Sequence, residues 1–253
     1  MHLGLLLAGL MGGSVVGLTG MGGGAILTPM LVLVFGVPPL QAVSSDLIVS
    51  LCMKPVGGWV HWRRGTVQTD LVRWLCVGSV PTAFVGAALI SRVDGDQVGE
   101  LLKKALGATL LLAATAMVLK ARFARRSEAA KAPVVRPLPT VAIGMFGGLL
   151  VGLTSVGSGS LMIVLLLMLY PTASAKSLVG TDLVQAIPLV ASASLGHLLF
   201  GHLALGLTAS LLVGALPGVY LGARLSTRAS DAFVRPALVT VLFASGLKLA
   251  GVV

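Results

Sequence analysis

The sequence predicts an all-α polytopic membrane protein made of two inverted-topology repeats, each with about five hydrophobic segments. Three observations lead to this fold class: the composition, the length of the uncharged stretches and an internal repeat. The chain has 253 residues, of which 56% are hydrophobic and only 10% are charged, and its mean hydropathy is +1.01. Soluble domains carry about 25% charged residues, so the composition excludes an ordinary soluble enzyme.

Uncharged stretches long enough to cross a bilayer define the apolar segments. No Asp, Glu, Lys or Arg occurs in residues 1–45, 137–175 or 183–223, and each stretch exceeds the ~20 residues that a spanning helix needs. The second and seventh segments are short for a span, which favours half-helices or re-entrant segments. The first lacks a basic start and a clear cleavage site, so we expect it to stay in the protein as a membrane segment. The segments are expected near residues 3–19, 24–36, 42–61, 71–91, 101–120, 138–155, 159–170, 178–200, 204–223 and 233–252.

The basic residues orient the chain in the membrane. The 18 Lys and Arg residues outnumber the 8 Asp and Glu residues, for a formal net charge of +10. They lie in short runs between apolar segments, which indicates membrane topology and not nucleic-acid binding. If all segments cross, only Arg92, Lys103 and Lys104 lie in the loops opposite to most other cations. The positive-inside rule then predicts a multi-pass protein of the plasma or inner membrane, with both termini outside and residues 120–139 in the cytoplasm.

An internal repeat divides the chain. GGSVVGLTGMGGG (residues 12–24) matches GGLLVGLTSVGSG (residues 147–159), and further along Asp-Leu, His and Pro recur at one constant offset. Because each copy holds an odd number of segments, the second enters the membrane from the opposite side, as in many secondary transporters. We therefore predict a first transmembrane repeat (residues 1–119), a basic cytoplasmic linker (120–139) and a second transmembrane repeat (140–253).

Two glycine-rich junctions are candidate substrate-binding elements. Glycine exposes backbone N–H groups, and a helix that starts there points the positive end of its dipole into the gap. Two such junctions facing each other at the midplane would bind an anion. The alternative is close helix packing through small residues, as in Gly13/Gly17 or Gly144/Gly148/Gly152. The candidate residues of the junctions are Thr19, Gly20, Gly22, Gly23 and Gly24 in the first, and Thr154, Ser155, Gly157, Ser158 and Gly159 in the second.

Three charged residues in the third and eighth segments are further candidates. Asp46 and Asp182 begin their segments, either as N-caps at the membrane edge or as a gating or protonatable pair. Lys54 lies about two helical turns beyond Asp46, and the second repeat has Val190 at the equivalent place. Because Lys54 is deep within its segment, snorkelling to the surface is hard. We expect Lys54 to face the pathway and to pair with an anionic substrate or with Asp46.

Histidine and proline recur in both repeats. His61 and His197 end their segments, either as neutral imidazoles at the membrane interface or as gating or proton-coupling residues. Pro81 and Pro217 lie inside the fourth and ninth segments and should kink them. They are candidate hinges, although such kinks are also routine packing features of membrane helices.

The glycine and proline pattern resembles the TauE/SafE family over essentially the whole chain. The resemblance rests on Gly13, Gly17, Gly20, Gly22, Gly23, Gly24 and Pro29, on their second copy, and on the S-S-D and G-T-D starts of the third and eighth segments. It implies a permease for small sulfur-containing anions such as sulfite or organosulfonates. The second copy departs where Gly20 and Gly23 become Ser155 and Ser158, so the two half-sites need not be equivalent.

The leading hypothesis is therefore a secondary transporter that binds a small anion between the two junctions and needs no cofactor. Cys52 and Cys76 lie in apolar stretches, which excludes a disulfide framework and a thiolate metal site. An anion or small-solute channel is the first alternative. A less favoured alternative is an intramembrane hydrolase that uses Ser158 with His197 or His202. The expected partners are the substrate and the lipid bilayer, and glycine faces such as Gly218/Gly222 would permit a homodimer.

Overall fold

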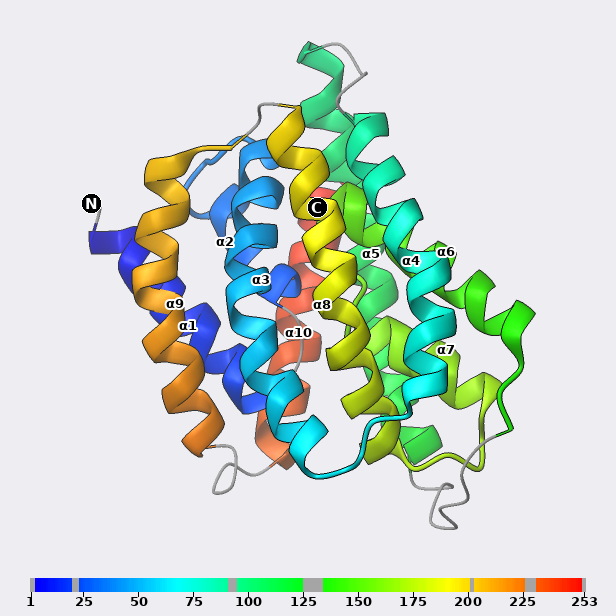
Figure 1. Cartoon of the computed structure of the whole chain (residues 1–253). Helices are drawn as coiled ribbons and strands as arrows, with labels where there is room; N and C mark the ends of the chain where they lie inside the picture. The colour runs from blue at the N-terminus through cyan, green and yellow to red at the C-terminus, as the bar shows by residue number, and fades with distance from the viewer. Residues whose placement is uncertain are drawn as a thin grey trace.

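The fold is a bundle of helices. The computed structural model describes residues 3–19, 23–90, 95–124, 134–200, 203–225 and 231–251, and every regular element in these ranges is helical (Figure 1). Each expected apolar segment forms a helix, so the all-helical class is confirmed. The elements are α1 (Leu3–Thr19), η1 (Gly23–Ala25), α2 (Leu27–Leu33), α3 (Pro39–Arg63), α4 (Thr69–Ile90), α5 (Gly95–Ala124), α6 (Pro137–Thr154), α7 (Ser160–Leu169), α8 (Ala175–Leu199), α9 (Leu205–Leu225) and α10 (Asp231–Leu249).

Helix length separates spanning helices from short ones. Five helices of the described part, α4, α5, α6, α8 and α9, are long and apolar enough to cross a membrane. By contrast, α2 has 7 residues and α7 has 10, which gives rises of about 10 and 15 Å against a hydrocarbon core of about 30 Å. The second and seventh segments are therefore short, as predicted.

Two helix pairs, α1 with α9 and α4 with α6, make the most extensive contacts in the described part of the chain. Glycine allows this approach. A Cβ on Gly13 would meet the backbone of Ala215, and one on Gly148 would meet the backbone of Ser79. The prediction of small-residue packing is confirmed for the glycines that lie at these seams, which are Gly13 on α1 and Gly144, Gly148 and Gly152 on α6.

The Gly218/Gly222 face is already covered within the chain. A Cβ on Gly218 would meet the backbone of Leu10, and one on Gly222 would meet the backbone of Ser14, both on α1. This face therefore packs inside the molecule and is not a free surface for a second copy. A homodimer stays a prediction that would need a different surface.

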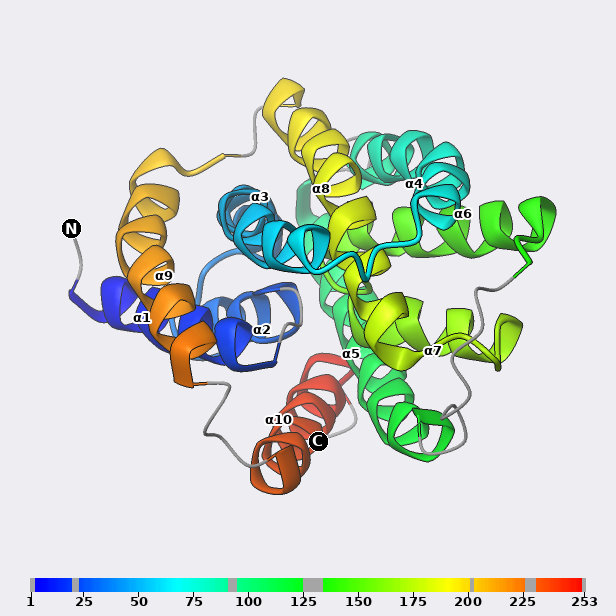
Figure 2. The same cartoon turned by 60° about the horizontal axis from the view of Figure 1, so that its bottom comes forward.

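Helices α3 and α8 pass through the centre of the bundle side by side. The colours in Figure 1 show that α3 descends while α8 ascends, and that α4 ascends while α9 descends. In Figure 2, α2 lies beside α3 and α7 lies beside α8, both toward the side where α5 and α10 lie. The short helices thus begin within the protein, next to the centre.

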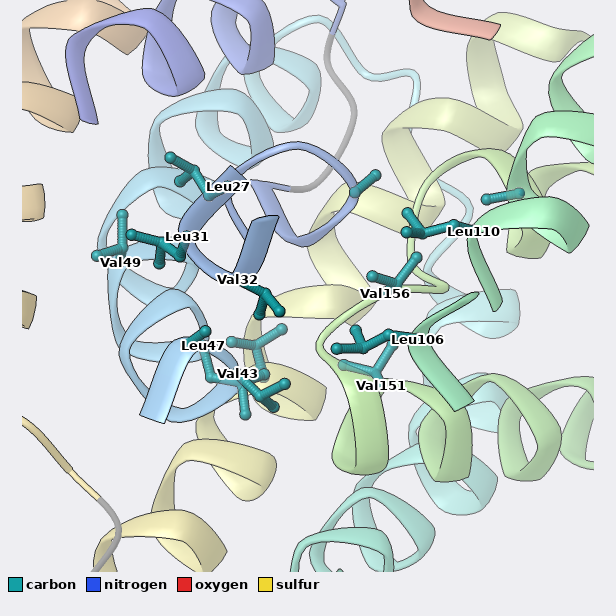
Figure 3. Packing of buried hydrophobic residues seen from close by; sticks show 14 of the residues in the cluster. Leu27, Leu31, Val32, Val43, Leu47, Val49, Leu106, Leu110, Val151 and Val156 are labelled. Carbon is teal, nitrogen blue, oxygen red and sulfur yellow. The ribbon is translucent and has the colours of Figure 1, made fainter. Parts of the chain in front are cut away.

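The largest buried apolar cluster surrounds the helix breaks. It joins α2 and α3 to α5 and to the turn after α6 (Figure 3). Its members include Leu27, Leu31, Val43, Leu47, Leu106, Leu110, Val151 and Val156. Side chains this well buried fix the backbone that they belong to, so both breaks are held in a packed core.

Two sequence predictions are refined by the helix bounds. Helix α5 continues through Ala124 and α6 begins at Pro137, so both enter the segment 120–139 that was predicted as a linker. Pro81 and Pro217 lie inside α4 and α9, and each helix continues through its proline. Their role as hinges stays a prediction.

Candidate functional site

The break between α6 and α7 has three residues with positive φ. These are Ser155 at 60°, Gly157 at 135° and Gly159 at 101°. Glycine accepts such angles without the strain that a side chain brings. Ser155 caps α6 through its N–H, which donates to the carbonyl of Val151 at 2.8 Å. Because α7 starts directly after Gly159, the unpaired N–H groups of its first turn lie at this break.

The break before α2 touches the break before α7. Gly20 and Gly22 lie outside the described residues, but Gly23 and Gly24 form η1 and are buried. A Cβ on Gly24 would meet the backbone of Ser155, and one on Gly23 would lie 3.2 Å from Oδ1 of Asp46. The two glycine-rich junctions therefore meet at one place, beside α3.

Asp46 and Asp182 face the two breaks from inside their helices. The Ser155 hydroxyl donates to Oδ2 of Asp46, and the N–H of Gly159 donates to Oδ2 of Asp182 at 2.8 Å. The N-cap interpretation is wrong, because α3 already begins at Pro39 and α8 at Ala175. The polar residues before each aspartate resemble a cap in sequence but lie within the helix. The start of α3 is instead at Pro39, and proline is well suited to the first turn of a helix.

Lys54 is buried and interacts with both carboxylates. Its Nζ donates to Oγ of Ser158 at 2.6 Å, and the side chain interacts electrostatically with Asp182 and Asp46. Only 6% of the residue is exposed, so it does not snorkel to the surface. Serine at position 158, which replaces a glycine of the first repeat, thus provides the contact for this lysine.

Asp46, Asp182 and Lys54 carry a net charge of −1 when all three are ionised. Apart from His197 and Tyr170, they are the only buried titratable side chains recorded for the described residues. At an effective dielectric constant of about 20, unit charges 4 Å apart interact by about 4 kcal/mol. Charges that lie close together in this buried group therefore interact strongly.

Further polar residues, not foreseen from the sequence, extend this group. Gln185 donates from Nε2 to Oδ1 of Asp182 at 3.1 Å and accepts from the Ser79 hydroxyl at 3.1 Å. Within the described residues, the buried hydroxyl of Thr28 and Oδ1 of Asp46 make no hydrogen bond of standard geometry, although these two side chains interact with each other. Gln185 could have been recognised from the sequence, because it lies one helical turn after Asp182 on the same face. Nothing in the sequence points to Ser79 or Thr28, since serine and threonine side chains commonly form hydrogen bonds within their own helix.

The two predicted threonines bond their own chain segments. Thr19 donates to the carbonyl of Val15 at 2.8 Å. Thr154 donates to the carbonyl of Leu150 at 2.7 Å and accepts from the N–H of Val156 at 3.2 Å. The Thr154 side chain therefore holds the shape of the break. The contacts of the break with the charged side chains come from Ser155, Ser158 and Gly159.

The two histidines have different surroundings. In His197, Nδ1 lies 2.8 Å from the Ser44 hydroxyl and Nε2 lies 2.9 Å from the carbonyl oxygen of Gly152. This residue is 2% exposed, so it is not an imidazole at the membrane interface but a buried link between α8, α3 and α6. His61 is partly exposed, with Nδ1 3.0 Å from the hydroxyl of Thr66.

Within the described residues, the hydrolase pairing of Ser158 with His197 is not formed. Ser158 contacts Lys54, while both ring nitrogens of His197 contact Ser44 and Gly152. His202 lies outside the described residues. The geometry thus brings a lysine, two carboxylates and the start of a helix together, and Ser158 pairs with Lys54 and not with His197.

Replacing His197 with alanine is expected to lower the free energy of unfolding by about 2 kcal/mol, because two buried hydrogen bonds lose one partner each. Unfolding in mixed detergent micelles measures this change. His61→Ala is the matched control, since it removes the equivalent histidine from a partly exposed place, and its expected effect is below about 0.5 kcal/mol. Equal effects of the two substitutions would contradict the linking role of His197.

Comparison with known proteins identifies the family. The family model described as "Sulfite exporter TauE/SafE" matches residues 5–249. The chain belongs to the TauE/SafE family. It is 36% identical to the "Probable membrane transporter protein YjnA" of Bacillus subtilis (strain 168), over 98% of this chain and 100% of that protein. It is 26% identical to the "Probable membrane transporter protein YdhB" of the same organism, over 94% of this chain and 95% of that protein.

This TauE/SafE protein is a multi-pass membrane transporter. The family match, the names of the relatives and the five apolar helices of spanning length agree on this. No solved structure gives a significant match.

Proposed function

We propose that this TauE/SafE protein is a secondary transporter, a permease and not an enzyme, that carries a small sulfur-containing anion such as sulfite or an organosulfonate. The observation that carries the proposal is the buried ammonium of Lys54, 2.6 Å from Ser158 at the start of α7. A charged donor, a hydroxyl and the N–H groups of a helix N-terminus are the groups that bind tetrahedral oxyanions.

The proposed binding site lies where the two glycine breaks meet. Lys54 would supply the positive charge, and Ser158 and Gly159 would supply donors from the second break. Gly23 and Gly24 let the first break approach Asp46 and Ser155 closely, because a side chain on either glycine would meet these neighbours. With α2 and α7 both shorter than a full span, the site would lie near the midplane, open in turn to each side.

An inverted repeat would account for the packing of the bundle. If α1 to α5 correspond to α6 to α10, then the α1–α9 seam and the α4–α6 seam are the same contact made by the two repeats. The opposite directions of α3 and α8 in Figure 1 agree with this correspondence. We retain the orientation that the positive-inside rule predicts, with residues 120–139 in the cytoplasm.

The polar contacts of the central helices are also paired. Thr208, at the start of α9, donates to Ser45 at 3.0 Å, and Gln68, just before α4, donates its N–H to Thr181 at 3.0 Å. Ser45 and Thr181 are equivalent in the two repeats. Each repeat thus contacts the centre in a similar way, which supports transport by movement of one repeat against the other.

Purified protein in liposomes is expected to take up radiolabelled sulfite and methanesulfonate with saturable kinetics. Protein-free liposomes give the background, and the panel also includes carboxylates and chloride. Uptake that saturates and is inhibited by unlabelled sulfonate supports a carrier. Absence of uptake for every anion in the panel contradicts the proposal. Ohmic single-channel currents would show that the protein is a channel and not a carrier.

A further inference from the structure

We propose that transport is coupled to protons because the ionised carboxylate of Asp182 occupies the place of the substrate anion. This inference rests on the proposed function and concerns the same site. Oδ2 of Asp182 accepts the N–H of Gly159 at the start of α7. The hydroxyl oxygen of the preceding residue, Ser158, accepts a hydrogen bond from the ammonium of Lys54. An oxyanion bound here would need these same donors.

The charges of the site favour entry of the anion together with a proton. Lys54 is accompanied by two carboxylates, Asp46 and Asp182, so the ionised group is already negative before any substrate binds. A monovalent anion that enters alone adds a further negative charge in a place shielded from water. When one carboxylate takes up a proton as the anion enters, the total charge of the site does not change. A divalent anion requires both carboxylates to be protonated.

Asp182 is a better competitor for the substrate than Asp46. Asp46 accepts a hydrogen bond from the side chain of Ser155, which can rotate away. Asp182 accepts from a backbone N–H, which is fixed by the start of α7. Protonation of Asp182 removes the negative charge that now interacts with this N–H and with Lys54. The substrate itself undergoes no chemical change.

The neighbouring elements contribute few other titratable groups. Asp182 lies on α8, which packs against α3, α4, α6 and α7. Helices α6 and α7 contain no titratable side chain. Helix α3 contributes Lys54 and Asp46, and its last turns carry His61 next to Gly180, followed by Arg63. Helix α4 contributes Cys76, whose Sγ lies 4.0 Å from the carbonyl oxygen of Gln185, and the exposed pair Asp70 and Arg73. His197, at the far end of α8, bonds Ser44 and Gly152.

The test measures the binding of methanesulfonate to the purified full-length protein between pH 5.5 and 8. This sulfonate stays ionised throughout, so any pH dependence belongs to the protein. For the wild type, we expect the affinity to fall about tenfold per pH unit once Asp182 is ionised, since one proton binds with each anion. Asp182→Asn keeps the shape but not the charge, so it should bind at least about tenfold more tightly than the wild type at pH 8, with little pH dependence. Asp70→Asn, at an exposed carboxylate, should behave like the wild type.

A second measurement uses the wild type alone, in case Asp182→Asn does not fold. Calorimetry in buffers of different ionisation enthalpy should show uptake of about one proton per methanesulfonate near pH 7. Affinity that does not change with pH, with no proton uptake, would overturn the coupling while leaving the anion site intact. Absence of binding to any anion in wild type and variants alike would instead overturn the proposed function.

Discussion

Lys54→Met is expected to weaken anion binding and transport strongly. The substitution removes the buried cation that Ser158 holds in place and leaves the carboxylates of Asp46 and Asp182 facing the site. Removing one member of a buried, hydrogen-bonded charge pair costs about 2–5 kcal/mol, which corresponds to a loss of affinity of about 30-fold to several thousandfold. Calorimetric titration with methanesulfonate in detergent, followed by flux in liposomes, measures both effects.

Lys104→Met is the matched control for this substitution. Lys104 also lies on a helix and bonds an acidic residue, with Nζ 2.8 Å from Glu100, but its side chain is 65% exposed. Exposed ion pairs contribute little, so binding should stay within about twofold of the wild type. Similar losses from both substitutions would show that Lys54 does not contact the anion.

Gly148→Val is expected to prevent correct packing of α4 against α6. A Cβ at this position would meet the backbone and the side-chain hydroxyl of α4 at Ser79 and Thr82. Backbone atoms cannot move aside as the end of a flexible side chain can, so the helices must separate. We expect a loss of at least about 3 kcal/mol in the free energy of unfolding, or no folded protein. Size-exclusion chromatography in detergent and unfolding in mixed micelles measure this outcome.

Gly206→Val controls for the general effect of replacing a helical glycine with valine. A Cβ on Gly206, in the first turn of α9, would meet nothing within 4 Å, so little change in stability is expected. If Gly148→Val were as stable as Gly206→Val, α4 and α6 would have to lie farther apart than they do in the structure.

Much of the fold could be predicted from the sequence because the bilayer limits the choices. An uncharged stretch of sufficient length must be helical there, since every backbone polar group needs a partner within its own segment. The short second and seventh segments were predictable for the same reason. Helix starts were less predictable. The runs before Asp46 and Asp182 resemble caps, but the preceding residues continue the helices back to Pro39 and Ala175.

The candidate site was predictable where a residue stood out from its surroundings. Lys54 did so, because lysine is costly in an apolar helix. Contacts between distant residues were not predictable. The link from Ser44 to His197 joins positions 153 residues apart, and the contact between Gly24 and Ser155 joins two different breaks. Such contacts depend on how the helices pack, which one sequence without its relatives does not record.

The shortness of α7 has an electrical consequence for the transported anion. Its 10 residues rise about 15 Å from Gly159 to the exposed residues 171 and 172, which is about half of the ~30 Å hydrocarbon core. A monovalent anion held at Gly159 would therefore experience about half of the transmembrane voltage. At 100 mV this amounts to about 1.2 kcal/mol, or about a sevenfold change in occupancy. An anion that enters together with its proton is electrically neutral, so its occupancy would be insensitive to voltage.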